Sequence, residues 1–178
     1  LQGVLELKKG NREEARELLL DTISERPFAQ RELLVLAGIE AEDGNLEKAR
    51  EFVRRHLAQA PYSLPGIRLQ ALIHYRGGDI AAAASALEDG LRYYPGNVEL
   101  LAALGEAYNR LGHWDKAARV MQQASRLSPE SAEYRAGLAY ARLGQGDAEV
   151  AMAELATAES LDAELPVVGL YSIVAHMR

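Results

Sequence analysis

Several common sources of function are scarce or missing in this sequence of 178 residues. It contains no cysteine, which excludes disulfide bonds, thiolate metal sites and a cysteine nucleophile. Aromatic residues make up only 6% of the chain although 48% of it is hydrophobic, so the core must consist mainly of aliphatic side chains and alanine. A hydrophobic share of this size also excludes disorder of the whole chain.

Positive charge and long apolar runs are also in short supply. Lys and Arg number 20 against 26 Asp and Glu, a net charge of -6, which leaves no excess of cations to neutralise phosphates. The longest apolar run, residues 166–175, contains Gly169, Tyr171 and Ser172 and is shorter than the ~18 residues that a membrane helix needs. We therefore expect no nucleic-acid partner and no insertion of this segment into a membrane.

The start of the sequence shows no targeting pattern. The chain begins at Leu1, and neither a signal peptide nor an Arg-rich transit peptide is recognisable. We expect the sequence to be a fragment of a longer protein, so composition alone leaves the compartment open.

A repeat of 34 residues organises the chain. Three series of residues keep this step: Pro27, Pro61, Pro95 and Pro129; Gly10, Gly44, Gly78, Gly112 and Gly146; Ala15, Ala49, Ala83, Ala117 and Ala151. Apolar residues before and after each glycine recur at helical spacing. Each unit is therefore predicted to be a helix, a tight glycine turn and a second helix, which ends before the next proline.

The residue after each glycine is typically of a helix-capping type. Asn11, Asn45, Asp79 and Asp147 are such residues, and they predict that a helix starts just after the glycine. Glu14 follows Asn11 at the spacing of a capping box. In the unit that starts at residue 98, the small residues Gly105 and Ala117 are expected where its two helices approach closely.

The segment LLAALGEAYNRLGHWDKAARVMQQASRLSP resembles the tetratricopeptide repeat, or TPR. It has Leu104-Gly105, Tyr108, Gly112, Ala124 and Pro129 at the family's spacings. The resemblance implies an all-α, right-handed superhelical solenoid of helix-turn-helix repeats in a single array over residues 1–178. We expect a truncated repeat at 1–29, complete repeats at 30–63, 64–97, 98–131 and 132–165, and the first helix of a further repeat at 166–178.

A second, finer resemblance concerns the C-terminal segments LGQGDAEVAMAELATAESLDAELP and VVGLYSIVAHMR. They are similar to the TPR lipoproteins of bacterial exosortase (PEP-CTERM) and exopolysaccharide systems. This similarity implies a periplasmic or membrane-anchored extracytoplasmic scaffold, whereas a generic TPR segment would be cytoplasmic.

The sequence contains no recognisable catalytic or metal-binding pattern. The four histidines match no zinc spacing, and the glycines form no phosphate-binding loop. Carboxylates such as Glu40, Glu42 and Asp43 are expected on solvated helix faces, and Trp114 is expected to be wedged between helices. The sequence thus predicts a protein that is not an enzyme, with no cofactor and no metal.

In the TPR family, the first helix of each repeat lines a concave groove. By register, the groove residues implied here are Arg31, Leu34, Arg68, Leu72, Tyr75, Arg76, Glu106, Asn109, Arg110 and Tyr140, with Glu99, Glu133 and Leu143 on the same stripe. The residues of the chaperone-binding carboxylate clamp are absent. Arg68, Arg76 and Arg110 are expected either to meet carboxylates of a ligand or to pair with Glu106 or Glu99.

The resemblance therefore implies a noncatalytic scaffold that binds a protein or peptide segment in its groove. Its setting would be exopolysaccharide export or exosortase sorting. The alternative is a regulatory or substrate-recruiting segment of a larger enzyme such as a glycosyltransferase. A two-fold homodimer through uncapped ends is also expected, since Leu1, Val4, Leu5 and the apolar residues 167–174 would otherwise face solvent.

Overall fold

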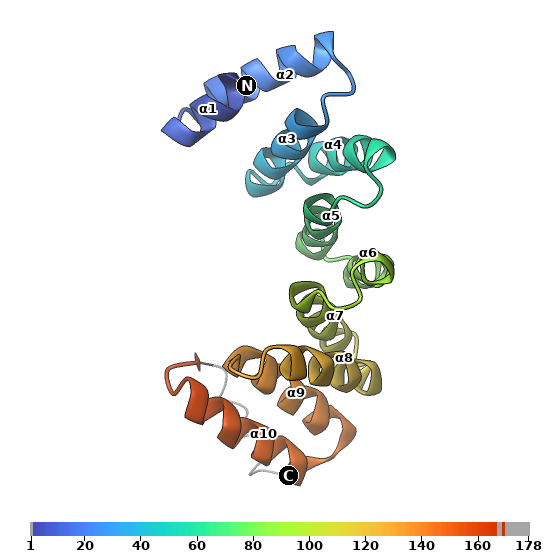
Figure 1. The fold of residues 1–178 in the computed structure, drawn as a ribbon, viewed down its shortest axis with the longest axis vertical. Coiled ribbons are helices and arrows are strands. Elements are labelled where there is room, and N and C mark those ends of the chain that lie inside the picture. The colour runs from blue at the N-terminus through green and yellow to red at the C-terminus, as the bar shows by residue number, and fades with distance from the viewer. Residues whose placement is uncertain (1, 167–168, 170–178) are drawn as a thin grey trace. The chain divides into compact units, whose positions relative to one another are not determined.

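The structure is a computed structural model that describes residues 2–166 and 169. Within these residues the chain forms helices and no strand, which confirms the all-α repeat fold (Figure 1). The helices are α1 (Gln2–Lys9), α2 (Arg12–Glu25), α3 (Gln30–Glu42), α4 (Leu46–Gln59), α5 (Leu64–Arg76), α6 (Ile80–Tyr93), α7 (Val98–Arg110), α8 (Trp114–Leu127), α9 (Ala132–Gln145) and α10 (Ala148–Leu161).

The repeated glycines lie in the turns that join the two helices of each pair. All five have a positive φ, from 71° at Gly112 to 89° at Gly10. Side chains with a Cβ rarely adopt this left-handed conformation, so glycine is required at each turn. The repeated prolines lie two residues beyond the ends of α2, α4, α6 and α8, where they follow the end of each second helix.

Helices begin just after the predicted capping residues, but most of these side chains make no capping hydrogen bond to the helix that follows. Asp79 Oδ1 accepts the Ala82 N–H at 2.9 Å, as a cap should. Asn11, in contrast, donates backwards from Nδ2 to Glu6 at 2.7 Å, and its backbone N–H donates to the Glu6 carbonyl at 3.0 Å. The predicted capping box between Asn11 and Glu14 is therefore wrong, because Glu6 already binds the groups that Glu14 would need.

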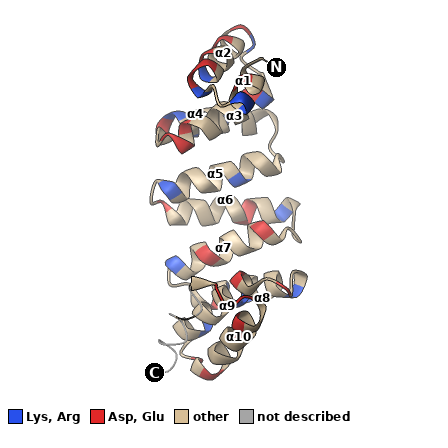
Figure 2. Ribbon diagram, turned by 90° about the vertical axis from the view of Figure 1, so that its left-hand side faces the viewer, with Lys and Arg blue, Asp and Glu red and all other residues tan. Residues whose placement is uncertain are grey.

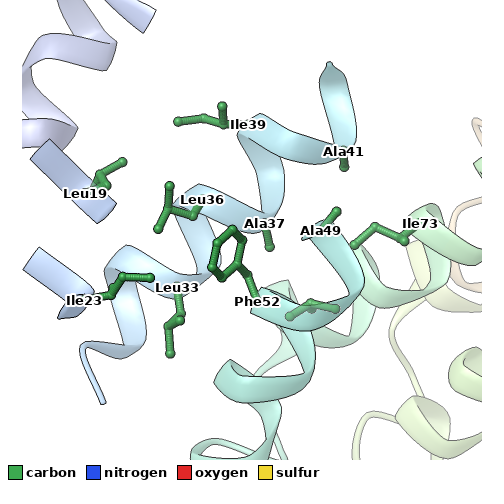
Figure 3. Packing of buried hydrophobic residues seen from close by; sticks show 11 residues of the cluster. Leu19, Ile23, Leu33, Leu36, Ala37, Ile39, Ala41, Ala49, Phe52 and Ile73 are labelled. Atoms are coloured by element: carbon green, nitrogen blue, oxygen red, sulfur yellow. The ribbon is translucent and has the colours of Figure 1, made fainter. Parts of the chain in front are cut away.

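The chain divides into two compact units, residues 1–86 and 87–178, with the division inside α6. The core of the first unit is aliphatic with a single aromatic ring. Figure 3 shows side chains of α2, α3, α4 and α5 pointing toward one another around Phe52. The buried cluster consists of Leu19, Ile23, Leu33, Leu36, Ala37, Ile39, Ala41, Ala49, Phe52, Val53 and Ile73.

A buried carboxylate links α3 to α2 in this unit. Glu40 is 1% exposed and accepts a hydrogen bond from Asn45 Nδ2 at 2.7 Å. Its other oxygen lies 3.1 Å from Arg16 Nε, and the same arginine also contacts Asp43. The expectation of a solvated Glu40 is therefore wrong, since Arg16 from the preceding repeat and Asn45 from the turn cover it.

A buried histidine joins three helices of the same unit. His56 in α4 is 5% exposed, and its Nδ1 donates to the Gln30 carbonyl, 2.8 Å away at the start of α3. Its Nε2 lies 2.8 Å from Ser63 Oγ, which also accepts the Gly66 N–H at 3.2 Å in the first turn of α5. A carbonyl can only accept, so the neutral ring with the proton on Nδ1 satisfies every group in this chain of hydrogen bonds.

Small residues allow the helices of the second unit to pack closely. A Cβ added to Gly105 in α7 would come within 2.6 Å of Met121 Cγ, which confirms the predicted close approach of α7 and α8. A Cβ on Gly137 in α9 would come within 2.7 Å of Cε of the same methionine. Met121 is therefore packed between two helices that both present glycine.

The next interface, between α9 and α10, is built largely from alanine. Its buried cluster consists of Ala132, Ala136, Ala139, Leu143, Ala151, Leu155 and Ala158. The core composition expected from the sequence is thus confirmed among the described residues. The apolar end expected at residues 167–174 lies outside the described residues, apart from Gly169.

Candidate functional site

The predicted groove residues of the first unit lie on α3 and α5. Arg31 and Arg68 are exposed, Leu34 and Tyr75 are half-buried, and Leu72 is 41% exposed. Arg76, at the end of α5, donates from Nη1 to the Ala41 carbonyl of α3 at 2.8 Å. Its guanidinium therefore ties two neighbouring first helices together, in addition to any contact it makes with a ligand.

In the second unit, the predicted residues surround a hollow of 680 Å³, which we call the α7–α9 hollow. It is lined by Glu99, Ala102, Ala103, Glu106, Asn109 and Arg110 of α7, Met121 of α8, and Glu133, Tyr134, Ala136, Gly137 and Tyr140 of α9. The structure thus brings together Glu106, Asn109, Arg110 and Tyr140 of the sequence prediction. Leu143 is 3% exposed and belongs to the core, so its expected place on the groove stripe is wrong.

Charged side chains of both signs line the hollow. Glu99, Glu106 and Glu133 line it, and Arg110 is its one guanidinium. Arg110 Nη2 lies 3.3 Å from Glu106, in a pair whose side chains are both more than half exposed. This pairing is one of the two arrangements expected for the groove arginines, whereas Arg68 and Arg76 belong to the other unit. Acidic and basic positions of α7 can be followed in red and blue in Figure 2.

Two tyrosines of α9 give the hollow an aromatic side. Tyr140 is 38% exposed, and its ring packs edge-on against Trp114 with centroids 5.7 Å apart. Burial raises the pKa of the Tyr134 hydroxyl, and the charges of Glu133 and Glu99 raise it further. Both carboxylates therefore lie near enough to the Tyr134 hydroxyl to disfavour its ionisation.

One polar side chain of the hollow is buried and half satisfied. Asn109 is 6% exposed and donates from Nδ2 to the Gly137 carbonyl at 3.0 Å. Its Oδ1 has no hydrogen-bond partner within the part of the chain that the structure describes. A buried acceptor without a donor costs free energy, which the packing of α7 against α9 must offset.

Tyr134, Met121 and Gly137 are among the lining residues that sequence reasoning missed. Tyr134 directly follows Glu133, which was predicted to lie on the groove stripe. A large aromatic side chain at this position could have indicated that it also lines the groove. Met121 and Gly137 carried no such signal, because their role depends on the packing of α8 between α7 and α9. Trp114 contacts Tyr140 and lies against Gly144, where an added Cβ would come within 2.2 Å of the indole, which confirms the expected wedge between helices.

The described residues offer neither a metal site nor a membrane-spanning helix. No group of three or more His, Asp or Glu side chains that could hold a metal ion occurs among residues 2–166 and 169. Nor does any helix in this range have the length and apolar character needed to cross a membrane. The α7–α9 hollow, which brings four of the predicted groove residues together, is the candidate site.

Comparisons with known proteins agree with the repeat architecture. Family models described as Tetratricopeptide repeat match residues 1–63 and 75–139. A sequence search of curated proteins finds no significant match. Solved structures, in contrast, match over most of the chain.

A crystal structure of MamA has a TM-score of 0.85 at 18% identity and covers 91% of this chain and 95% of its own. MamA from Desulfovibrio magneticus RS-1 has a TM-score of 0.83 at 20% identity, with 92% of this chain and 93% of its own covered. The thermophilic TPR protein TTC0263 from Thermus thermophilus has a TM-score of 0.66 at 24% identity and covers 99% and 96%. With its helix pairs, turn glycines and matching family models, the chain belongs to the tetratricopeptide repeat family.

Proposed function

We propose that this chain is a noncatalytic scaffold that binds a peptide or protein segment on the first helices of its repeats. The α7–α9 hollow carries the proposal, because four of the residues predicted from the repeat register line one open space. A repeat array contacts only its neighbours and presents an extended surface, which suits a segment better than a small substrate.

The residues of the first unit extend the proposal to a second stretch of groove. Arg31, Leu34, Arg68, Leu72, Tyr75 and Arg76 combine arginine, tyrosine and leucine on the first helices of their repeats. Arginine and tyrosine are favoured anchors in binding sites. We propose these residues as further ligand contacts within that unit.

The cellular setting of the proposal comes from the sequence resemblance alone. It is bacterial exopolysaccharide export or exosortase sorting, in which this chain would be an extracytoplasmic scaffold. The alternative is a recruiting segment of a larger enzyme such as a glycosyltransferase. The full-length reading frame separates them: a lipobox and further repeats favour the first, and a catalytic domain favours the second.

Self-association is a separate part of the proposal. Leu5 on α1 is 52% exposed, and an exposed leucine on a terminal helix is suited to contact a second copy of the chain. We propose a two-fold dimer through this helix.

The binding proposal is tested by selecting a random dodecapeptide display library on the whole chain. Ala102→Phe fills the hollow with a ring, and we expect it to abolish capture of the selected peptides. Ala156→Phe on the exposed face of α10 is the matched control and should leave capture unchanged. No enrichment, or equal capture by both variants, would overturn a binding role for this hollow.

A further inference from the structure

The first unit contains a hollow that the proposed function does not use. It has a volume of 460 Å³ and lies between α4 and α5, and we call it the α4–α5 hollow. Val53 and Ile73 form its apolar part, and its other lining side chains are charged or polar. The polar side chains therefore decide which ligand the hollow can take.

The two carboxylates of the lining are already engaged with arginines. Glu47 pairs with Arg50, and Glu51 lies 3.6 Å from Nη1 of Arg55, which is not part of the lining. The remaining arginine of the lining is Arg54, and no carboxylate of a described residue pairs with it. The lining therefore holds one guanidinium whose charge is not offset by an ion pair.

Three side chains of the lining have hydrogen-bonding groups to spare. Arg54, Gln70 and His74 make no side-chain hydrogen bond and no ion pair with another described residue. Gln70 and His74 are half-buried and stand one turn apart on α5, and Arg54 is an exposed residue of α4. The polar atoms of these side chains are not cut off from solvent, so a ligand in the hollow can reach them. Guanidinium, amide and imidazole groups can all donate a hydrogen bond.

The next repeat shows which group is missing at this place. Arg54 and His74 each stand 34 residues before a residue of a bonded pair, Glu88 and Tyr108. In that pair the Tyr108 hydroxyl donates to the Glu88 carboxylate. At the earlier position an arginine replaces the glutamate, so the donor on α5 has lost its carboxylate acceptor and has gained a cation as neighbour.

Repulsion on α4 favours an anion at the same place. Arg50 and Arg54 are four residues apart on this helix, a spacing at which like charges destabilise a helix. A carboxylate bound beside Arg54 would relieve this repulsion. Its two oxygens also match the paired N–H groups of a guanidinium.

We propose that the α4–α5 hollow binds a carboxylate side chain of an acidic protein segment. Arg54 holds the carboxylate, and Gln70 and His74 donate further hydrogen bonds to it. This inference goes beyond the proposed function, because Arg54 lies on the second helix of its repeat and neither Gln70 nor His74 belongs to the predicted groove stripe.

The test uses labelled nonapeptides in which glycine alternates with glutamate or with glutamine. Fluorescence anisotropy measures their binding to the whole chain. We expect the glutamate peptide to bind at least ~10-fold more tightly than the glutamine peptide. The chain has a net charge of -6, so general electrostatic attraction cannot produce this order. Equal binding of the two peptides would overturn the proposal.

A third peptide separates a carboxylate from a phosphate. It carries two phosphoserines in place of the four glutamates, which gives it a similar charge. We expect it to bind more weakly than the glutamate peptide. Tighter binding of the phosphoserine peptide would identify the ligand as a phosphate and contradict the proposed carboxylate.

A charge-matched pair of variants locates the interaction. Arg54→Gln should weaken binding of the glutamate peptide by ~10-fold or more. Arg126→Gln removes the same charge from an exposed position of α8 and should change binding less than ~3-fold. Equal effects of the two variants would show that binding follows net charge alone, and the site would be wrong.

A double variant distinguishes loss of the site from loss of the fold. Arg54→Glu combined with His74→Tyr reproduces the Glu88–Tyr108 pair and supplies the carboxylate from within the chain. We expect this variant to keep its helices by circular dichroism and to lose the glutamate peptide. Unchanged affinity in the folded double variant would contradict the assignment.

The α7–α9 hollow provides the last control. Ala102→Phe fills that hollow and should leave binding of the glutamate peptide unchanged. Loss of the glutamate peptide in this variant would place its binding in the α7–α9 hollow and overturn the site proposed between α4 and α5. The two proposals can therefore fail independently.

Discussion

At the scale of single residues, the buried carboxylate of Glu40 is the clearest target for mutation. Glu40→Ala removes the acceptor of Asn45 and the partner of Arg16 Nε. We expect the free energy of unfolding to fall by about 2 kcal/mol, because Glu40 is 1% exposed and its removal breaks a hydrogen bond and an ion pair and leaves unfilled space. Urea denaturation measures the loss.

The control for Glu40 is an ion pair on the surface. Asp89→Ala breaks the Asp89–Arg92 pair, whose groups lie 3.3 Å apart and whose side chains are well exposed. Such pairs contribute at most about 1 kcal/mol. A loss as large as that of Glu40→Ala would show that burial is not the cause.

Tyr108 predicts a dependence of stability on alkaline pH. Burial, together with the hydrogen bond that Tyr108 donates to Glu88, raises the pKa of this phenol to about 12. The ordinary value is about 10, so the contribution of Tyr108 is fully present below about pH 10 and is lost as the pH rises through about 12. Urea denaturation at several alkaline pH values should show this loss.

Tyr108→Phe supplies the comparison. Phenylalanine has no proton to lose, so the variant should show a smaller fall in stability over the same pH range. Absorbance of tyrosinate should also lack one late-titrating group. An unchanged pH profile in Tyr108→Phe would contradict the assignment.

At the scale of helices, two glycines predict opposite signs for one substitution. Gly38 in α3 has no atom within 4 Å of an added Cβ, whereas the same atom on Gly105 would meet Met121 Cγ at 2.6 Å. Gly38→Ala should raise the free energy of unfolding by about 0.5 to 1 kcal/mol, as alanine favours a helix. Gly105→Ala should lower it, since the methionine between α7 and α8 must move. Thermal unfolding of both variants measures the two changes in unfolding free energy. Changes of the same sign would contradict the packing described for Met121.

The junction of α3, α4 and α5 predicts an interaction between two residues. His56→Ala should cost about 2 kcal/mol of unfolding free energy and Ser63→Ala about 1 kcal/mol. Because Ser63 Oγ lies 2.8 Å from His56 Nε2, the double variant should lose less than the sum of the single losses. Additive losses in urea denaturation would show that the two side chains act independently.

At the scale of the whole molecule, we expect self-association that depends on α1. Sedimentation over a range of concentrations should detect a dimer, and Leu5→Glu should weaken it because a charge replaces an exposed leucine. Leu127→Glu is the matched control, since Leu127 is 50% exposed against 52% for Leu5. A monomer at every concentration, or equal effects of the two variants, would remove the proposed dimer.

How much could be predicted depended on how local each feature is. The turn at Gly112 and the helices on both sides follow from nearby residues, so the repeat pattern was sufficient for them. Capping by Asn11 was mispredicted because its partner is Glu6, a residue on the preceding helix. The repeat register also placed Asn109 and Tyr140 correctly on the lining of the hollow, whereas Leu143, three residues further along α9, turned out to lie in the core.

The sequence by itself determined the period, the helix pairs and the class of fold, because turn glycines, prolines and helical apolar spacing act within one repeat. Only the tertiary structure decided that Glu40 is buried, that Asn109 Oδ1 has no hydrogen-bond partner among the described residues, and that glutamates of α7 and α9 line the same hollow. Each of these depends on side chains from different helices that meet in space. The net charge of a site and the hydrogen bonding of its polar groups depend on neighbouring side chains from several helices. No single repeat contains all of these neighbours.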